Sequence, residues 1–202
     1  MVAQTFGRRL CLAIVPVGIL STFACGDGSI QQVGEPALIQ IQLTDAPADQ
    51  LASAEVWISR VFLQGGGGGG GPVDLFNDPE NPRHYDLLDL RDGVVADLTD
   101  PVMVDAGVYT QLRLVVDSAR VTFIEGFTLR DGSTEASLRV PSGSESGINV
   151  QLSEPVNVME GQLMVLLVDF DVEKNFVFQG PPTNPSGILF TPTLVELGRG
   201  PK

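Results

Sequence analysis

The feature that most constrains this chain is a long alternation of apolar and polar side chains between Gly107 and Val121. One parity holds Thr110, Leu112, Leu114 and Val116, and the other holds Tyr109, Gln111, Arg113 and Asp117. A period of two over such a length is typical of a β-strand with one buried and one solvated face. We therefore expect a central strand here, and its polar face, with Tyr109, Gln111 and Arg113, is a candidate binding surface.

Shorter segments of the same kind follow one another along the chain. Apolar stretches bounded by turn residues lie at 37–44, 54–63, 94–98, 102–104, 121–124, 127–130, 136–140, 148–152, 155–158, 162–172, 176–178 and 188–197. Hardly any segment has the 3.6-residue period of a helix, although 85–90 fits either a strand or one helical turn. The pattern predicts an all-β fold over residues 37–198: a single-domain antiparallel β-sandwich of about 9–11 short strands, immunoglobulin-like or prealbumin-like.

A run of seven glycines, Gly65–Gly71, interrupts this pattern. Each glycine in an ordered strand costs about 0.5–1 kcal/mol relative to alanine, so the run opposes regular structure. A proline-rich segment continues from it to His84, and we expect a mobile loop over 64–84. The run lacks the G-x-x-x-x-G-K-[ST] pattern that cradles phosphate, which argues against nucleotide binding.

Residues 1–24 have the three parts of a secretory signal peptide. Arg8 and Arg9 precede an apolar run over 10–20, and an exit segment follows at 21–24. Spanning a bilayer takes about 20 apolar residues, which is more than this run offers. We expect the chain to be exported and the leader to be removed.

Cys25 stands where a bacterial lipoprotein carries its lipid-modified cysteine. Thr22 and Phe23 depart from the usual lipobox, so cleavage by an ordinary signal peptidase is the alternative. Cys11 would leave with the leader, and Cys25 then has no disulfide partner in the remaining chain. We predict that Cys25 is lipidated and that residues 25–36 form a flexible tether.

The predicted location follows from this anchor and from the charge. Gly26, rather than aspartate, follows the cysteine, so we expect a membrane-anchored lipoprotein of the cell envelope, in the outer membrane if the host has two membranes. The chain carries 12 basic and 25 acidic residues, a formal net charge of −13. Such a charge repels phosphate backbones, so nucleic acid is not an expected partner.

Several segments resemble one known family. They are Leu43-Thr44-Asp45-Ala46-Pro47, Tyr85-Asp86-Leu87-Leu88-Asp89-Leu90, Gly107-Val108-Tyr109-Thr110-Gln111-Leu112-Arg113-Leu114, Val140-Pro141-Ser142-Gly143 and Leu167-Val168-Asp169-Phe170-Asp171-Val172. In this order they are similar to the domain-of-unknown-function family 4382, over residues 37–197. The resemblance implies an exported bacterial or archaeal protein, often a lipoprotein, with a β-sandwich fold. It supplies no activity and no catalytic residue.

Residues for familiar catalytic chemistry are scarce. His84 is the only histidine, so a histidine-based triad has at most one possible base. The segment 143–147 resembles a nucleophile elbow, but Glu145 stands at the centre where serine is required. One histidine and no thiol beyond Cys25 argue against a zinc site. We expect no cofactor and no enzyme activity.

The carboxylates leave two alternatives open. Glycoside hydrolysis uses a pair of carboxylates, and a chain with 25 acids can supply one. Asp169 and Asp171 lie on one strand face and could bind calcium, although no EF-hand loop supplies the six to eight oxygens that calcium takes. We expect a lipid-anchored, non-catalytic module that binds a glycan or an envelope protein. A carbohydrate-active hydrolase and a calcium-stabilised adhesion module are the alternatives.

Overall fold

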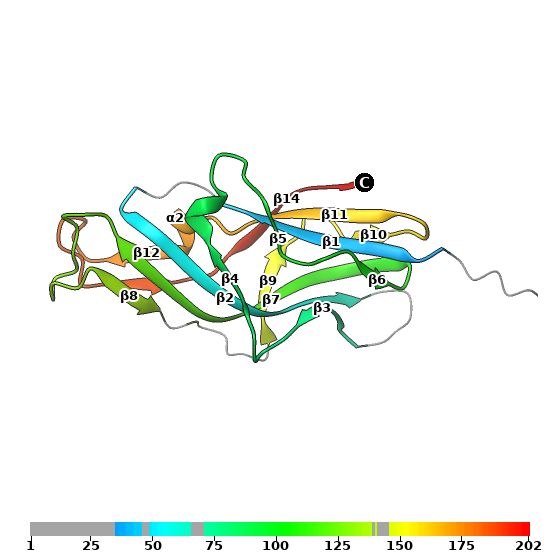
Figure 1. Ribbon diagram of the computed structural model, residues 1–202, viewed down its shortest axis with the longest axis horizontal. Coiled ribbons are helices and arrows are strands. Elements are labelled where there is room, and N and C mark those ends of the chain that lie inside the picture. Colours follow the sequence, from blue (N-terminus) through cyan, green and yellow to red (C-terminus); the bar gives the residue numbers. More distant parts are fainter. Residues whose placement is uncertain (1–34, 46–48, 66–70, 139, 141–145) are drawn as a thin grey trace, which may run out of the picture. The chain divides into compact units, whose positions relative to one another are not determined.

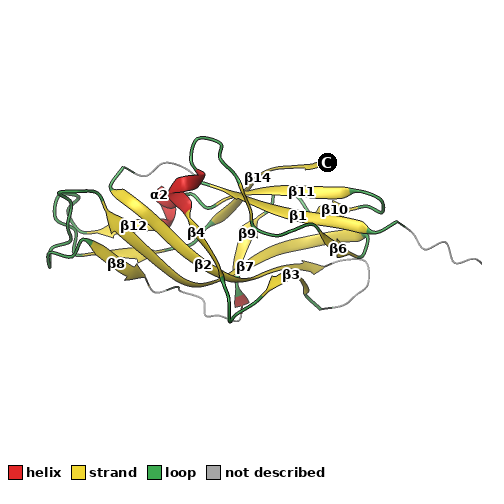
Figure 2. Ribbon diagram, viewed as in Figure 1, coloured by secondary structure: helices red, strands yellow, loops and turns green. Residues whose placement is uncertain are grey.

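The computed structural model describes residues 35–45, 49–65, 71–138, 140 and 146–202. Within these ranges the chain consists mainly of strands, which confirms the prediction of an all-β fold (Figure 1, Figure 2). The strands are β1 (Ala37–Thr44), β2 (Leu51–Gly65), β3 (Val73–Asn77), β4 (Arg83–Asp86), β5 (Ala96–Asp97), β6 (Val102–Val104), β7 (Gly107–Phe123), β8 (Glu135–Leu138), β9 (Ile148–Gln151), β10 (Val156–Val158), β11 (Leu163–Asp169), β12 (Phe176–Gln179), β13 (Gly187–Phe190) and β14 (Leu194–Pro201). The helical segments are η1 (Leu87–Leu90), a 3₁₀-helix, and α2 (Val172–Asn175).

The longest strands, β2 and β7, pair antiparallel along almost their whole length. The pairing runs from Leu51 opposite Phe123 to Gly65 opposite Tyr109. β7 also pairs with β8, β9 and β10, so the predicted central strand is central in the structure. The main path of neighbouring strands is β3-β2-β7-β9-β14-β11-β1-β5, and β12 pairs separately with β13.

The main sheet is mixed, which corrects the prediction of a purely antiparallel fold. β1 runs parallel to β11, from Leu38 opposite Leu163 to Thr44 opposite Asp169, and β9 runs parallel to β14. Alternation of apolar and polar residues reports which face of a strand is buried. It does not report the direction of the neighbouring strand, because side chains alternate in the same way in parallel and antiparallel ladders.

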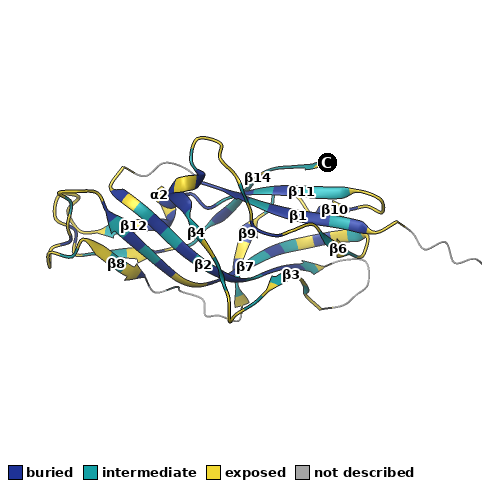
Figure 3. Ribbon diagram, in the orientation of Figure 1, coloured by how far each residue is buried: buried dark blue, intermediate teal, exposed yellow. Residues whose placement is uncertain are grey.

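One hydrophobic core unites the strands of the main sheet (Figure 3). Its members include Ile39 and Ile41 of β1, Val56 and Ile58 of β2, Leu112 and Leu114 of β7, and Leu166 and Val168 of β11. Every side chain in this group is fully buried. Burial of a large aliphatic side chain contributes about 1.5–3 kcal/mol, so these positions hold strands that are distant in sequence against one another.

A bulge near the start of β7 overturns the predicted placement of Tyr109. Gln64 pairs with Gln111 and Gly65 pairs with Tyr109, so Thr110 is an extra residue in the ladder. An extra residue shifts the alternation of the strand by one position, so the side chains that precede it lie on the face opposite to the one that simple alternation predicts. Tyr109 is consequently buried, with 1 % of its surface exposed, and Thr110 is exposed.

The predicted loop over 64–84 contains two ordered strands. β3 and the start of β4 lie inside it, and both pair with β2. The Arg83 guanidinium lies over the Phe76 ring at 4.6 Å and donates to the Leu98 carbonyl at 2.9 Å. Glycine and proline dominate the composition of this region and conceal the short strands, which are too brief to show alternation. Residues 66–70 of the glycine run lie outside the described ranges.

Other element boundaries also differ from the prediction: the segment 162–172 divides into β11, which ends at Asp169, and the start of α2. Residues 127–130 are irregular rather than a strand, and β7 pairs with β8 instead. The segment 188–197 is divided into β13 and β14 around Pro192, which has no N–H to donate to a ladder. The segment 85–90 contains both predicted alternatives: β4 ends at Asp86, whose carboxylate accepts from Leu88 N at 3.1 Å and caps η1.

The bulge gives a stability prediction. Gly65 and Gly93 both have positive φ, 85° and 83°, which costs an alanine about 1 kcal/mol. A Cβ on Gly65 would lie 2.9 Å from Thr110 Oγ1, whereas one on Gly93 would meet nothing within 4 Å. We expect Gly65→Ala to lower the free energy of unfolding by about 2–3 kcal/mol and Gly93→Ala by about 1 kcal/mol in urea denaturation. Equal losses would contradict the close contact at the bulge.

Candidate functional site

The predicted polar face of β7 is engaged within the protein. The buried Tyr109 donates its hydroxyl to the Asp105 carbonyl at 2.8 Å. Arg113 donates from Nε to Gln111 Oε1 at 3.1 Å and from Nη1 to the Ser146 carbonyl at 2.7 Å. Gln111 and Arg113 are half-buried, and Tyr109 belongs to the core rather than to an exposed binding surface.

Asp169 and Asp171 lie where β11 ends and α2 begins. Asp169 Oδ1 accepts from Asp171 N at 3.2 Å, and Asp171 accepts from Lys174 N at 3.2 Å and pairs with its Nζ. Burial raises the pKa of Asp169 above its usual 3.8, by more than the hydrogen bond from Asp171 N lowers it. In the part of the chain that the structure describes, no group of three or more histidine, cysteine, aspartate or glutamate side chains is placed to hold a metal ion. Both carboxylates act as caps for neighbouring backbone.

His84, the single candidate base, belongs to a cluster on β2, β4 and β7. Its ring stacks on Trp57 with centroids 4.7 Å apart, and its Nε2 lies 3.0 Å from Glu55 Oε1. Arg120 donates from Nε to Glu55 Oε2 at 2.8 Å, and its guanidinium lies 5.5 Å from the Trp57 ring centroid. These mutual contacts make the cluster an ion-pair and stacking network that joins three strands.

Two predicted features lie outside the described residues. Cys25, with the signal peptide and most of the tether, falls within 1–34, and Glu145, the centre of the elbow-like segment, falls within 141–145. No helix in the described ranges is long and apolar enough to cross a membrane.

Hydrogen bonds tie the ends of β1 and β11 to the start of α2. Phe170 N donates to the Thr44 carbonyl at 3.1 Å, and Val172 N donates to Asp45 Oδ1 at 2.8 Å. The Thr44 hydroxyl donates to the Leu90 carbonyl at 3.0 Å, which brings η1 to the same place. Parallel neighbours end at the same edge of a sheet, so the segments that follow β1 and β11 start side by side.

Asn175 fixes the other end of α2. Its side chain is fully buried, and its Nδ2 donates to the carbonyls of Phe170 and Thr193, the latter at 2.9 Å. Its Oδ1 accepts from Thr193 N at 2.7 Å, and its carbonyl accepts from Thr191 N at 2.8 Å. Loss of these bonds would leave buried polar groups unsatisfied, which is costly. Asn175 therefore sets the direction in which β12 leaves α2.

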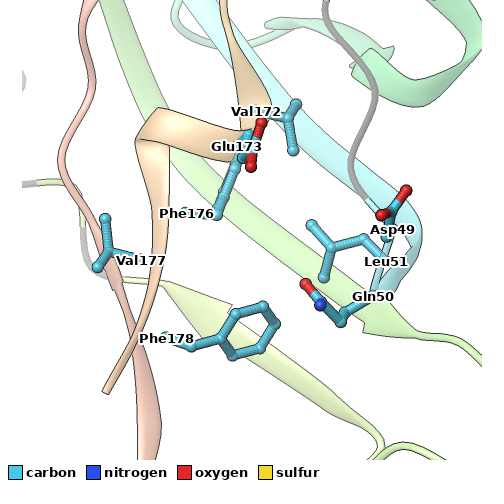
Figure 4. A pocket seen from close by; sticks show the side chains of 8 residues that line it. All are labelled: Asp49, Gln50, Leu51, Val172, Glu173, Phe176, Val177 and Phe178. Carbon is cyan, nitrogen blue, oxygen red and sulfur yellow. The ribbon is translucent and has the colours of Figure 1, made fainter. Parts of the chain in front are cut away.

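A pocket of about 450 Å³ lies between the start of β2 and the α2–β12 segment (Figure 4). One wall consists of Asp49, Gln50 and Leu51, and the other consists of Val172, Glu173, Phe176, Val177 and Phe178. The volume falls in the range of about 300–1,000 Å³ that is typical of small-molecule sites. The sequence places the two walls far apart, and the junction of β1 with β11 brings them together.

The pocket has an apolar floor and an acidic rim. Leu51 and Phe176 are buried, whereas Asp49, Gln50 and Glu173 are exposed. Asp49 and Glu173 are the charged side chains among the lining residues, and none of the described residues that line the pocket is basic. An apolar floor with a few polar groups at the rim is the usual composition of a ligand site.

Aromatic packing holds the α2–β12 wall in place. The centroid of the Phe178 ring lies 5.3 Å from that of Phe127 and 5.9 Å from that of Phe123. Phe176 stacks on Phe190 with centroids 5.0 Å apart. Such pairs contribute about 0.5–1.5 kcal/mol beyond the burial of their area, so the wall is formed before any ligand binds.

Sequence reasoning did not single out this pocket. Asp49 lies just before β2 and Glu173 lies in the first turn of α2, and charged residues at such positions are usually solvated. Phe176 and Phe178 alternate on one face of a short segment, and this aromatic pair is the signal that the sequence offers. The acids become informative only when the fold places them around the same apolar floor.

The protein is an all-β domain with a large mixed sheet. An acidic pocket with aromatic side chains in its wall lies between the start of β2 and the α2–β12 segment. The family model "Domain of unknown function (DUF4382)" matches residues 36–192, and the chain belongs to this family, as the resemblance predicted. No curated protein and no solved structure matches the chain. Residues 43–45, 85–90 and 167–172, which belong to segments that carry the resemblance, meet at the junction of β1, η1 and β11 beside the pocket.

The raised pKa of Asp169 gives a pH prediction. The pKa of this carboxyl is higher in the folded state than in the unfolded state, so the unfolded chain ionises first as the pH rises. The free energy of unfolding therefore falls above the ordinary pKa. We expect Asp169→Asn to raise the free energy of unfolding at pH 7, and the advantage over wild type to disappear below pH 3.8, the usual pKa of this group. Urea denaturation at several pH values measures the difference.

Asp171→Asn is the matched control, because the Asp171 carboxylate pairs with Lys174. Removal of that charge is expected to lower stability at pH 7. If Asp169→Asn also lowers stability at pH 7, the Asp169 carboxylate has a favourable partner in the folded protein and burial is not the dominant influence on it.

Proposed function

We propose that this protein is a lipid-anchored, non-catalytic binding module of the cell envelope, and that the pocket between β2 and β12 is its binding site. The observation that carries the proposal is the position of this pocket at the opposite end of β1 from Pro36. The proposed anchor is a lipid on Cys25, joined to the domain by the tether over 25–36.

β1 separates the tether side of the domain from the pocket. At its first end, Gly161 N donates to the Pro36 carbonyl at 3.2 Å, which places Pro36 beside the turn between β10 and β11. At its other end, Asp45 bonds to Val172 of the pocket wall. β1 has 8 residues, and a strand rises about 3.3 Å per residue, so roughly 23 Å separates the two ends. β1 runs from its pairing with β6 to the start of α2 (Figure 1). On this proposal a domain held from Pro36 presents the pocket away from the lipid surface.

We also infer that the main sheet forms a β-sandwich with its two parts joined at β9. The first two residues of β9 pair with β7 and the last two pair with β14, so this short strand links the parts that share the core. Tyr109 donates to the carbonyl of Asp105, four residues upstream. This contact resembles the tyrosine corner of β-sandwich proteins.

The proposed partners are a membrane leaflet, through the lipid on Cys25, and a glycan or an envelope protein at the pocket. For a host with two membranes, Gly26 favours the outer membrane as the location. The formal charge of −13 disfavours nucleic acid as a partner.

Cys25→Ala is expected to abolish incorporation of a labelled fatty acid in the native host. The protein should then leave the membrane fraction, because stable anchoring depends on buried acyl chains. Cys11→Ala is the matched control: Cys11 lies within the proposed leader, so this variant should label like the wild type. Fluorography after fractionation measures both effects, and equal labelling of wild type and Cys25→Ala would contradict the anchor.

One observation favours a carbohydrate-active hydrolase as the second candidate. The pocket is lined by the carboxylates of Asp49 and Glu173, and glycoside hydrolysis uses two carboxylates. On this hypothesis a panel of glycosides is hydrolysed, and both Asp49→Asn and Glu173→Gln reduce kcat by at least about 100-fold. The binding-module proposal predicts no turnover by the wild type, and turnover lost in both variants would decide for the hydrolase.

A further inference from the structure

We propose that the pocket between β2 and β12 binds an organic ammonium group carried on an apolar body. The ligand chemistry is that of an alkylammonium, either in a small amine or in a lysine side chain of a peptide. The inference rests on the proposed binding function of this pocket and names the chemical class of its ligand.

The charge of the pocket is the first argument. Asp49 contributes a carboxylate from the β2 wall and Glu173 contributes one from the α2–β12 wall (Figure 4). Lys174, which follows Glu173, is paired with Asp171 and is not a lining residue. With two acids and no base among the described lining residues, the pocket attracts a cation and repels an anion.

The aromatic wall is a second and independent argument. Phe176 and Phe178 line the same cavity as the two acids. The faces of aromatic rings carry negative electrostatic potential and attract a cation within about 6 Å of the ring centroid. Because Phe127 and Phe190 hold these two rings, a ligand meets a formed surface and does not need to order it.

The floor accommodates the apolar part of such a ligand. Leu51 and Val172 are buried side chains that line the pocket below the acidic rim. A hydrocarbon body above this floor contacts the exposed Val177 and the half-buried Phe178 and is removed from water at about 25 cal/mol per Å² of apolar area. An ammonium group on this body then lies at the level of Asp49 and Glu173. A small inorganic cation would leave the apolar floor unused.

Three probes of similar size and different charge test the class of ligand. They are 2-phenylethylammonium, 2-phenylethanol and 3-phenylpropanoate, titrated into the full-length chain and followed by NMR shifts at the Leu51 and Val177 amides. We expect the ammonium to bind at least about five-fold more tightly than the alcohol and the propanoate not to bind. Nα-acetyl-lysine methylamide is a fourth probe, and tighter binding of it than of the amine would identify a peptide lysine as the source.

Variants of the pocket test the two arguments separately. Asp49→Asn and Glu173→Gln should each weaken ammonium binding about two- to five-fold and leave the alcohol unchanged, as expected for exposed ion pairs. Phe178→Ala should weaken binding of both the ammonium and the alcohol. Glu160→Gln is the matched control, because it removes a carboxylate beside Gly161, whose amide bonds to Pro36 at the far end of β1.

Equal binding of the ammonium and the alcohol would overturn the inference, as would unchanged ammonium affinity when Asp49 and Glu173 are both replaced. Failure of the ammonium to bind at all would overturn it as well. Binding of the neutral or the anionic probe alone would leave the pocket as a binding site for another class of ligand. The labelling of Cys25 tests the anchor independently of all these outcomes.

Discussion

The parallel pairing of β1 with β11 is the interaction on which the rest of the structure depends. It closes a contact between residues 127 positions apart, Asp45 and Val172, and closure of so long a loop costs conformational entropy. The buried side chains of Ile39 and Ile41 on one strand and Leu166 and Val168 on the other offset this cost. Because both strands end at the same edge, their last hydrogen bonds fix the start of α2. The pocket is a consequence of this shared edge.

The sequence predicts strands and buried faces well, since both follow from alternation along one segment. β1 occupies the predicted residues, and β7 is the central strand. Prediction fails where the determinant lies on another strand: the bulge at Thr110 depends on the close approach of Gly65, and the direction of β11 depends on β1. It fails for the pocket because Asp49 and Glu173 look like ordinary surface acids until the fold places them around one apolar floor.

Four acids near the pocket end have two different roles. Asp169 and Asp171 accept hydrogen bonds from the backbone N–H groups that follow them, so they organise the turn into α2. Asp49 and Glu173 lie at the exposed rim, where Glu173 interacts electrostatically with the neighbouring Lys174. Carboxylates that cap backbone have their acceptor sites occupied. The acceptor sites of the rim carboxylates remain open to solvent or to a ligand. We therefore propose that Asp49 and Glu173, rather than Asp169 and Asp171, interact with the ligand.

The separation of roughly 23 Å between the ends of β1 affects how an anchored protein selects a cation. An anionic leaflet collects cations at its own surface, and its field decays over a Debye length of about 8 Å at physiological ionic strength. On the proposed anchoring, the pocket lies more than two such lengths beyond the tethered end of the domain. The leaflet therefore contributes little to the potential at the pocket. On the proposed cation binding, selectivity comes from the carboxylates of Asp49 and Glu173 and the rings of Phe176 and Phe178, which line the pocket.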